Sequence, residues 1–330
     1  MNTPIQTPPP AVCDRAPDWQ PRPALREAMQ QIATIAVDDS TAVISDRSMT
    51  FQNLGERTTI SAQPMNVDTI DGMRIAEIVT IRTPLTAFKL FDEKNYSFIN
   101  IFATTGAIVR DADGEDLLIS RVPLFEGDDE TLADLYTPLI ADAARLQPVG
   151  SFSGLYHYEG RKEEYEAAFV GVPGWDEPSY WGSEEFAYAE ERLRAQGAYA
   201  NASDTGLTVE YPWEQGAVSA IAGDCTSMLQ IRSDQPHPSA GNGLFYRLSL
   251  PTNCSDDEAF EYAAKLNRAE LEAIDAPPFF GAWCAMPQSG TVSFVGFWPN
   301  LLYRPGTVAS IGFWTWARSR FARQVIANWN

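Results

Sequence analysis

Histidine, cysteine and basic residues are scarce in this 330-residue chain, and each shortage narrows what it can do. It has two histidines, His157 and His237, and four widely spaced cysteines. The side chains that most often bind metals or transfer protons near neutral pH are therefore few. The cysteines form no CxxC pair, and a chain this long does not need disulfides to fold, so we expect reduced thiols. No catalytic residue, cofactor or metal site is predicted.

Basic residues are outnumbered, because 24 Lys and Arg face 44 Asp and Glu, giving a formal net charge of -20. Such a field repels phosphate backbones, so we expect no nucleic-acid partner. No apolar run approaches the roughly 18 residues that cross a bilayer. The N-terminus also lacks the basic and apolar regions of a signal peptide. These features predict a cytoplasmic protein.

The chain is 45% hydrophobic and 12% aromatic, which is enough for sizeable cores, and its length allows about two domains. An internal repeat supports two. A shift of 169 residues places 59–84 on 228–253, with apolar alternation in both copies. A shift of 176 places 107–123 on 283–299 and aligns Gly114 with Gly290. Both segments have the turn residues and alternation of β-hairpins, so we infer a duplication.

Helical patterns occur at matching places in the two halves. Their ranges are 23–36 and 183–193, 91–104 and 256–274, and 128–146 and 306–328. Ser183 and Ser255 are suitable N-caps for two of them. Each half thus has the order helix, strand, hairpin, helix, hairpin, helix. This order predicts an α+β protein with two similar antiparallel-sheet domains, each carrying its helices on one face.

Proline and glycine mark the boundaries between these units. Seven prolines fall within the first 23 residues, and glycine and proline interrupt the periodicity after residue 147. The expected parts are a Pro-rich disordered tail at 1–23, a first domain at 24–147, a linker at 148–180 and a second, Trp-rich domain at 181–330.

Two short motifs resemble ligand sites but are interpreted as turns. In 111–116 the glycine comes too early for an EF-hand, and Val122 stands where the bidentate Glu should be, so we predict a hairpin turn. His237, between two prolines, has no nearby Cys or second His, and we expect it to be solvent-exposed in a loop.

The last predicted helix is the candidate interaction surface. Trp314 and Trp316 are two residues apart, so on a helix they point about 200° apart and one domain face cannot bury both. The segment 304–330 also has four arginines and no acid. Burial between the domains, and arginines that merely complement a helix end, are the structural alternatives. The candidate protein interface comprises Phe313, Trp314, Trp316, Arg318, Arg320, Phe321 and Arg323.

The element order resembles the YbjN-like domains of the type III secretion chaperone-like fold. The similarity is carried by Ala263-Ala264-Lys265-Leu266-Asn267 before the strands at 281–284 and 291–298, and by Phe98-Ile99-Asn100 before the strand at 107–110. The resemblance implies an acidic, cytoplasmic protein-binding adaptor or chaperone, and it assigns no catalytic residues.

Three functions follow as alternatives. The leading one is a non-catalytic cytoplasmic adaptor or chaperone-like protein, with a protein partner that the residues do not identify. The second is an enzyme with an acidic cleft between the domains, using Asp275 or Glu272 beside Trp283 and Arg304. The third is an assembly subunit whose last helix completes a homo-oligomer. Membrane contact through this basic aromatic helix is the weakest alternative.

Overall fold

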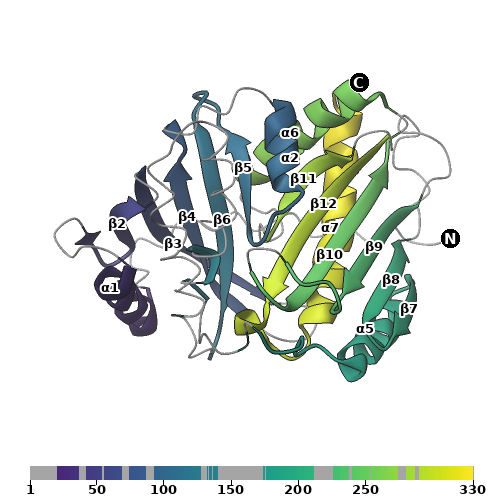
Figure 1. The fold of residues 1–330 in the computed structure, drawn as a ribbon, viewed down its shortest axis with the longest axis horizontal. Helices are drawn as coiled ribbons and strands as arrows, with labels where there is room; N and C mark the ends of the chain where they lie inside the picture. The colour runs from purple at the N-terminus through teal and green to yellow at the C-terminus, as the bar shows by residue number, and fades with distance from the viewer. Residues whose placement is uncertain are drawn as a thin grey trace, which may run out of the picture.

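The fold consists of two six-stranded antiparallel sheets that lie side by side, with helices packed against them (Figure 1). This confirms the predicted α+β class. The computed structural model describes residues 21–36, 42–53, 56–68, 74–86, 93–127, 132, 134–135, 137–139, 174, 176–211, 226–237, 240–252, 254–273, 280–286 and 290–329. Most of the predicted tail at 1–23 and of the predicted linker at 148–180 lies outside these residues.

The two sheets have the same topology. The first has the order β1-β2-β3-β4-β6-β5, and the second has the order β7-β8-β9-β10-β12-β11. The first-sheet strands are β1 (Val43–Ile44), β2 (Ser48–Asn53), β3 (Glu56–Asp68), β4 (Arg74–Pro84), β5 (Gly106–Arg110) and β6 (Asp116–Phe125). The second-sheet strands are β7 (Tyr199–Ser203), β8 (Gly206–Tyr211), β9 (Ser227–Arg232), β10 (Gly243–Pro251), β11 (Ala282–Met286) and β12 (Thr291–Pro299).

The helices occupy the predicted positions. They are α1 (Pro23–Ala36), α2 (Glu93–Asn100), α5 (Ser183–Ala195), α6 (Asp256–Glu272), α7 (Thr307–Ala327) and the short 3-10 helix η3 (Asn300–Leu302). Ser255 caps α6 in a complete capping box with Glu258, as predicted. Gly182, rather than Ser183, is the N-cap of α5. Of the predicted helix at 128–146, only residues between 132 and 139 are described, and they are helical.

The structure corrects two details of the repeat. The single strand expected after each first helix is a hairpin, β1–β2 in one domain and β7–β8 in the other. The gap-free shift of 169 also fails along the strands. Ile60 pairs with Ile81, whereas Leu229 pairs with Leu248, two residues before the position that the shift requires. The difference is two residues, an even number, so each side chain keeps its face of the sheet.

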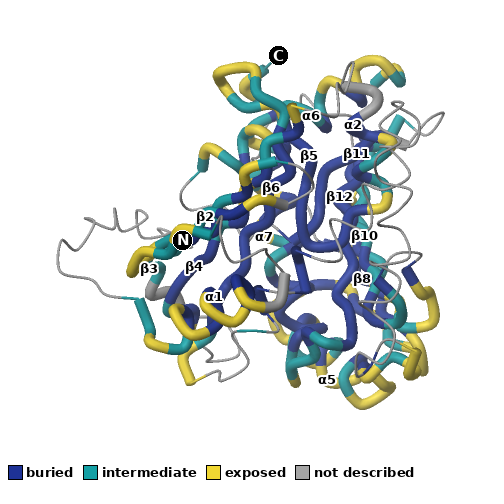
Figure 2. Tube along the Cα trace, turned by 60° about the vertical axis from the view of Figure 1, so that its left-hand side comes forward, coloured by how far each residue is buried: buried dark blue, intermediate teal, exposed yellow. Residues whose placement is uncertain are grey.

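Each sheet buries one face against helices. In the first domain Leu25, Met29 and Ile32 of α1 join Ile60 and Val79 in the apolar core. In the second domain α5 and α7 cover the face that carries Leu244, Tyr246 and Leu248. Figure 2 shows that the strands are mostly buried, whereas exposed residues lie on turns and on the outer sides of α1 and α5.

Helices α2 and α6 join the two domains. Each lies against the second hairpin of its own domain and also contacts an edge strand of the other, α2 with β11 and α6 with β5. The side chain of Ser97 on α2 accepts a hydrogen bond from the backbone N–H of Ala285 at 3.0 Å. The backbone N–H of Gly281 donates to the carbonyl of Thr105 at 3.2 Å. The inner edge strands β5 and β11 are therefore each covered in part by the other domain of the same chain.

One asparagine occupies the same place in each domain. The Asn100 side chain accepts from the N–H of Ile108 at 2.9 Å and donates to its carbonyl at 3.0 Å. Asn267 makes the same pair of bonds to Trp283, both at 2.8 Å. These asparagines fix each central helix to the strand that follows it, and they identify Ile108 and Trp283 as equivalent positions.

Candidate functional site

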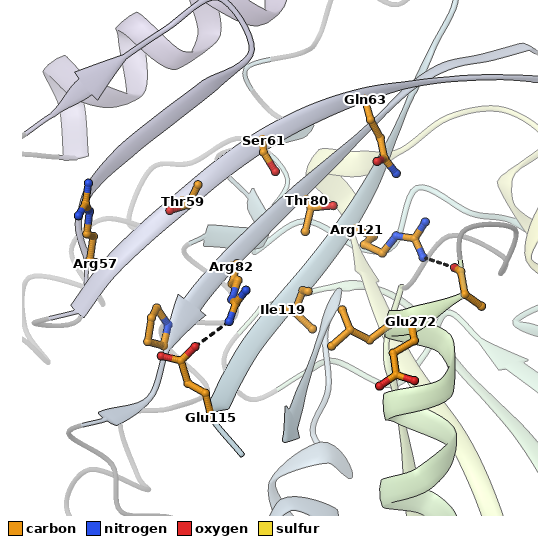
Figure 3. A pocket seen from close by; sticks show the side chains of 13 residues that line it. Arg57, Thr59, Ser61, Gln63, Thr80, Arg82, Glu115, Ile119, Arg121 and Glu272 are labelled. Carbon is orange, nitrogen blue, oxygen red and sulfur yellow. Dashed lines mark hydrogen bonds and ion pairs between the residues drawn. The ribbon is translucent and has the colours of Figure 1, made fainter. Parts of the chain in front are cut away.

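A groove opens on the face of the first sheet that α1 does not cover, with a volume of about 690 Å³ (Figure 3). Its floor is formed by β3, β4 and β6, and the C-terminal turn of α6 forms one wall. Strand register arranges the floor in rows. Thr59, Arg82 and Ile119 lie in one row, because Arg82 pairs with both neighbours. The next row has Ser61 and Arg121 on either side of Thr80.

Arg121 is the most buried charged residue of this groove, with a relative exposure of 5%. Its Nη1 donates weakly to the carbonyls of Glu270 and Ala273, both at 3.4 Å, where α6 ends. Burial lowers the pKa of the guanidinium, and the nearby Glu270 carboxylate opposes this shift. Among the described residues, neither Nε nor Nη2 of Arg121 has an acceptor, and both retain access to solvent.

Behind Arg121 lies a buried ion pair. The Glu270 carboxylate is fully buried and accepts from Arg318 Nε at 2.8 and 3.1 Å and from the Trp283 indole N–H at 2.7 Å. The Arg318 guanidinium also lies over the Phe294 ring at 3.8 Å. The Glu270 carboxylate acts on Arg121 but is already paired with Arg318. Among the described residues, Arg121 itself forms no ion pair.

Most charged side chains at the rim are paired. Arg82 binds Asp111 at 3.0 Å and Glu115 at 2.6 Å. Glu272 binds Arg268 at 2.8 Å. These pairs are partly exposed and contribute little to stability, and together they carry one net negative charge. Arg57 also lines the groove, where it is exposed and has no ion pair among the described residues. Arg121 is therefore the buried positive charge of the groove.

The polar side chains of the groove floor are also able to form hydrogen bonds with a ligand. Ser61, Gln63 and Thr80 have no hydrogen-bond partner for their side chains within the part of the chain that the structure describes. Hydroxyl and amide groups both donate and accept hydrogen bonds. The floor can therefore bind a polar ligand beside Arg121.

In the second domain, aromatic side chains occupy the position that is equivalent to the groove. Phe297 lies three residues beyond Phe294, just as Arg121 lies three beyond Leu118, and these reference residues pair with Trp283 and Ile108. Its row contains Arg232 and Phe245 where the first sheet has Ser61 and Thr80. Phe245, Ala240 and Phe297 form a small apolar cluster there. The open polar groove is thus a property of the first domain alone.

His237 belongs to this filled site, and the prediction that it is solvent-exposed is wrong. It is 8% exposed, lies 5.1 Å from the Phe297 ring, and hydrogen-bonds through Nε2 to the carbonyl of Phe102 at 3.0 Å. Its backbone N–H donates to Gly241 in a short bridge. The tertiary contact with the first domain buries His237, although its neighbour Pro236 is exposed.

The candidate interface on α7 is largely inside the second domain. Phe313 and Arg318 are buried, at 8% and 2% exposure, so they do not offer a docking surface. Trp314 stacks on Phe280 and Trp298 at 5.9 and 6.1 Å. Helix α7 packs on α5, α6, β9 and β10 of its own domain.

The remaining members of that predicted interface line the outer side of α7. Trp316 stacks on Tyr211 at 5.3 Å and remains half-buried. Arg320 is exposed above the Trp316 ring, and Phe321 is half-buried. Arg323 donates to the Ser227 hydroxyl at 2.7 Å. Of these four members, Arg320 is therefore accessible on the surface of α7, and the half-buried side chains of Trp316, Phe321 and Arg323 are accessible in part.

The residues proposed for an enzymatic cleft have separate partners. Trp283 is fully buried against Glu270, Glu272 pairs with Arg268, and Arg304 pairs with Asp134 at 3.0 Å. Asp275 lies outside the described residues. The pKa of Glu258 is lowered, first by the backbone N–H of Ser255. That of Asp234 is lowered, first by its hydrogen bond from Arg232.

Sequence reasoning missed the groove. Its residues are spread over β3, β4, β6 and α6, and no motif joins them. One signal was present, since Arg121 interrupts the otherwise apolar run Leu117-Leu118-Ile119-Ser120-Arg121-Val122 of a predicted strand. The turn at 111–116 was predicted correctly, because Asp111 Oδ1 accepts from the N–H groups of Asp113 and Glu115, and Gly114 has a positive φ of 82°.

No protein-family model, curated protein or solved structure matches this chain. Within the described ranges, no helix is long and apolar enough to span a bilayer. In the same ranges, no group of three or more His, Cys, Asp or Glu side chains is placed to hold a metal ion.

Proposed function

We propose that this protein is a non-catalytic, protein-binding adaptor or chaperone-like protein, and that the groove of the first sheet holds its partner. The observation that carries the proposal is the contrast between the two domains. At the same place in one fold, Phe245 and Phe297 fill the site in one copy, whereas Thr80 and Arg121 leave it open in the other. A buried arginine kept beside an open groove costs stability unless a ligand uses it.

The size and shape of the groove favour a segment of a protein. Its volume of about 690 Å³ is within the usual range for ligand sites, and its floor is the open face of three neighbouring strands. Such a floor accommodates an extended chain lying across it. The interlocked helices α2 and α6 hold one wall in place, so the site is largely preformed.

The relationship to YbjN-like domains and the cytoplasmic location belong to this proposal. Asn100 and Asn267 make the same two backbone bonds in the two domains, which supports a repeated unit of that kind. The two described cysteines, Cys254 and Cys284, are free thiols, as is usual in a reducing compartment.

Site-specific photo-crosslinking in native cells tests the proposal. A photoreactive phenylalanine analogue at Gln63, an exposed residue that lines the groove, is expected to give a defined protein adduct. The matched control places it at Tyr199, which is 72% exposed on β7 of the other sheet. If Gln63 gives no protein adduct, or only those that Tyr199 gives, the adaptor function is wrong. An adduct with a second copy of the chain would indicate an assembly role instead.

A further inference from the structure

We propose that Arg121 binds a carboxylate group of the partner side-on, through its Nε and Nη2 atoms. The inference rests on the proposed function only for the source of the carboxylate, because the chemistry of the site is independent of who supplies it. Three observations carry it: the free edge of the guanidinium, the charge that Arg121 holds without an ion pair among the described residues, and the polar floor around it.

The free edge has the geometry of a carboxylate receptor. Both hydrogen bonds of Arg121 use Nη1, which donates to the carbonyls of Glu270 and Ala273 at the end of α6. These two contacts fix the plane of the guanidinium. The Nε and Nη2 donors then lie in that plane, along one edge of the group, and their parallel N–H bonds are arranged to bind two carboxylate oxygens at once. Both atoms are without an acceptor among the described residues and reach the groove.

The charge on Arg121 favours an anion with a single negative charge. The nearby Glu270 carboxylate already accepts from Arg318 and Trp283. One further carboxylate neutralises Arg121. A phosphate carries up to two negative charges and would meet Glu115 and Glu272, which also line the groove. The net charge of -20 opposes anions at long range, but salt largely screens that repulsion beyond about 8 Å, whereas Arg121 acts in contact.

The floor provides further bonds. Thr80 neighbours Arg121 in its row and Ser61 follows it on the next strand, with strands about 4.8 Å apart. A carboxylate on Arg121 leaves lone pairs that a hydroxyl at this spacing can reach. Figure 3 shows Thr80 between Arg82 and Arg121, with Ser61 and Gln63 along the neighbouring strand β3. The segment that follows the carboxylate therefore lies over a polar surface.

The test is nuclear magnetic resonance of the full chain labelled at the arginine Nε atoms, with the Arg121 signal assigned from its loss in Arg121→Lys. The probes are a blocked five-residue peptide with a central glutamate, its glutamine twin, the glutamine peptide with a free C-terminus, and inorganic phosphate. The glutamate peptide is expected to shift the Arg121 Nε–H signal and to bind at least about tenfold more tightly than its twin. The free C-terminus distinguishes a terminal carboxylate from a side-chain one.

Three variants keep the test falsifiable. Arg121→Lys retains the charge but loses the fork, so the glutamate peptide should bind about tenfold more weakly. Thr80→Val keeps the shape of a floor residue and should weaken binding by a few-fold. Arg320→Lys, at an exposed position of α7, is the matched control and should leave binding of the glutamate peptide unchanged. Circular dichroism checks that each variant is folded.

The inference is overturned if the glutamate and glutamine peptides bind equally, if phosphate binds and the glutamate peptide does not, or if no probe moves the Arg121 signal up to about 5 mM. Its failure is distinguishable from failure of the adaptor function. A protein adduct at Gln63 without a carboxylate response retains the adaptor and rejects this inference. A carboxylate response without a protein adduct rejects the adaptor function and retains this inference.

Discussion

Replacing Glu270 by glutamine tests the buried cluster on which the groove depends. The carboxylate is fully buried and accepts from Arg318 at 2.8 and 3.1 Å and from the Trp283 indole at 2.7 Å. Glutamine keeps the shape but has one oxygen and no charge. Its amide group would turn two donors toward the guanidinium or the indole, which are themselves donors. Arg318 would then lose the carboxylate with which it pairs, and Arg121 would lose the negative charge that favours its charged form.

The magnitude follows from the chemistry of buried pairs. Removing one partner of such a pair costs about 3–5 kcal/mol, because the other charge remains desolvated. For a urea m-value of about 2–3 kcal/mol/M, this lowers the unfolding midpoint by roughly 1–2 M. Glu272→Gln is the matched control on the same helix. Its carboxylate is 55% exposed and pairs with Arg268 four residues earlier, so the expected loss is below about 0.5 kcal/mol.

Urea unfolding followed by tryptophan fluorescence measures both variants, because Trp283 donates directly to Glu270. A loss below about 1 kcal/mol for Glu270→Gln would refute the reasoning. It would mean that the two arginines do not depend on this carboxylate for neutralisation, and the charge argument for the groove would fall with it. If the variant folds at lower urea, the blocked glutamate peptide should bind it more tightly than wild type.

Three further predictions concern stability. Burial raises the pKa of the Cys284 thiol to about 12. Above about pH 9 only the unfolded chain releases that proton, so stability falls by up to about 1.4 kcal/mol per pH unit. Cys284→Ala should therefore reduce the slope of the urea midpoint against pH between about pH 9 and 11. An unchanged slope would contradict this. Asn267→Ala leaves the N–H and C=O of Trp283 without partners and should cost about 2–4 kcal/mol in urea unfolding, whereas a loss below about 1 would show that water replaces the amide. Trp314→Ala should lower the free energy of unfolding by about 2–4 kcal/mol and reduce the melting temperature, because it removes the contacts with Phe280 and Trp298. The control Arg320→Ala, at an exposed position, should change the free energy of unfolding by less than about 0.5 kcal/mol. Equal melting temperatures would mean that Trp314 is a free surface residue.

The secondary structure and the duplication could be predicted because their causes are local. Apolar spacing along 23–36 and the box formed by Ser255 and Glu258 act within one or two helical turns. Hairpin turns such as Asp113-Gly114 need a glycine at positive φ, which the residue type reports directly. The α+β class and the repeated element order followed from such signals.

The errors arose where distant segments meet. His237 looked free because only its neighbours in sequence were visible, yet it is buried by the carbonyl of Phe102 from the other domain. Trp314 looked like an interface residue, yet Phe280 and Trp298 cover much of it. Arg318 looked like a surface cation until Glu270 was brought beside it.

The sequence by itself determined the strands, the helices and the twofold repeat, because backbone hydrogen bonds and side-chain periodicity are set by nearby residues. It also determined the acidic character of the chain. Only the tertiary structure decided where a function could lie. The docking of α6 onto the first sheet puts Arg121 beside two carbonyls and an already paired carboxylate, and so leaves one guanidinium edge facing an open groove. That outcome depends on contacts between residues about 150 positions apart, which no local pattern encodes.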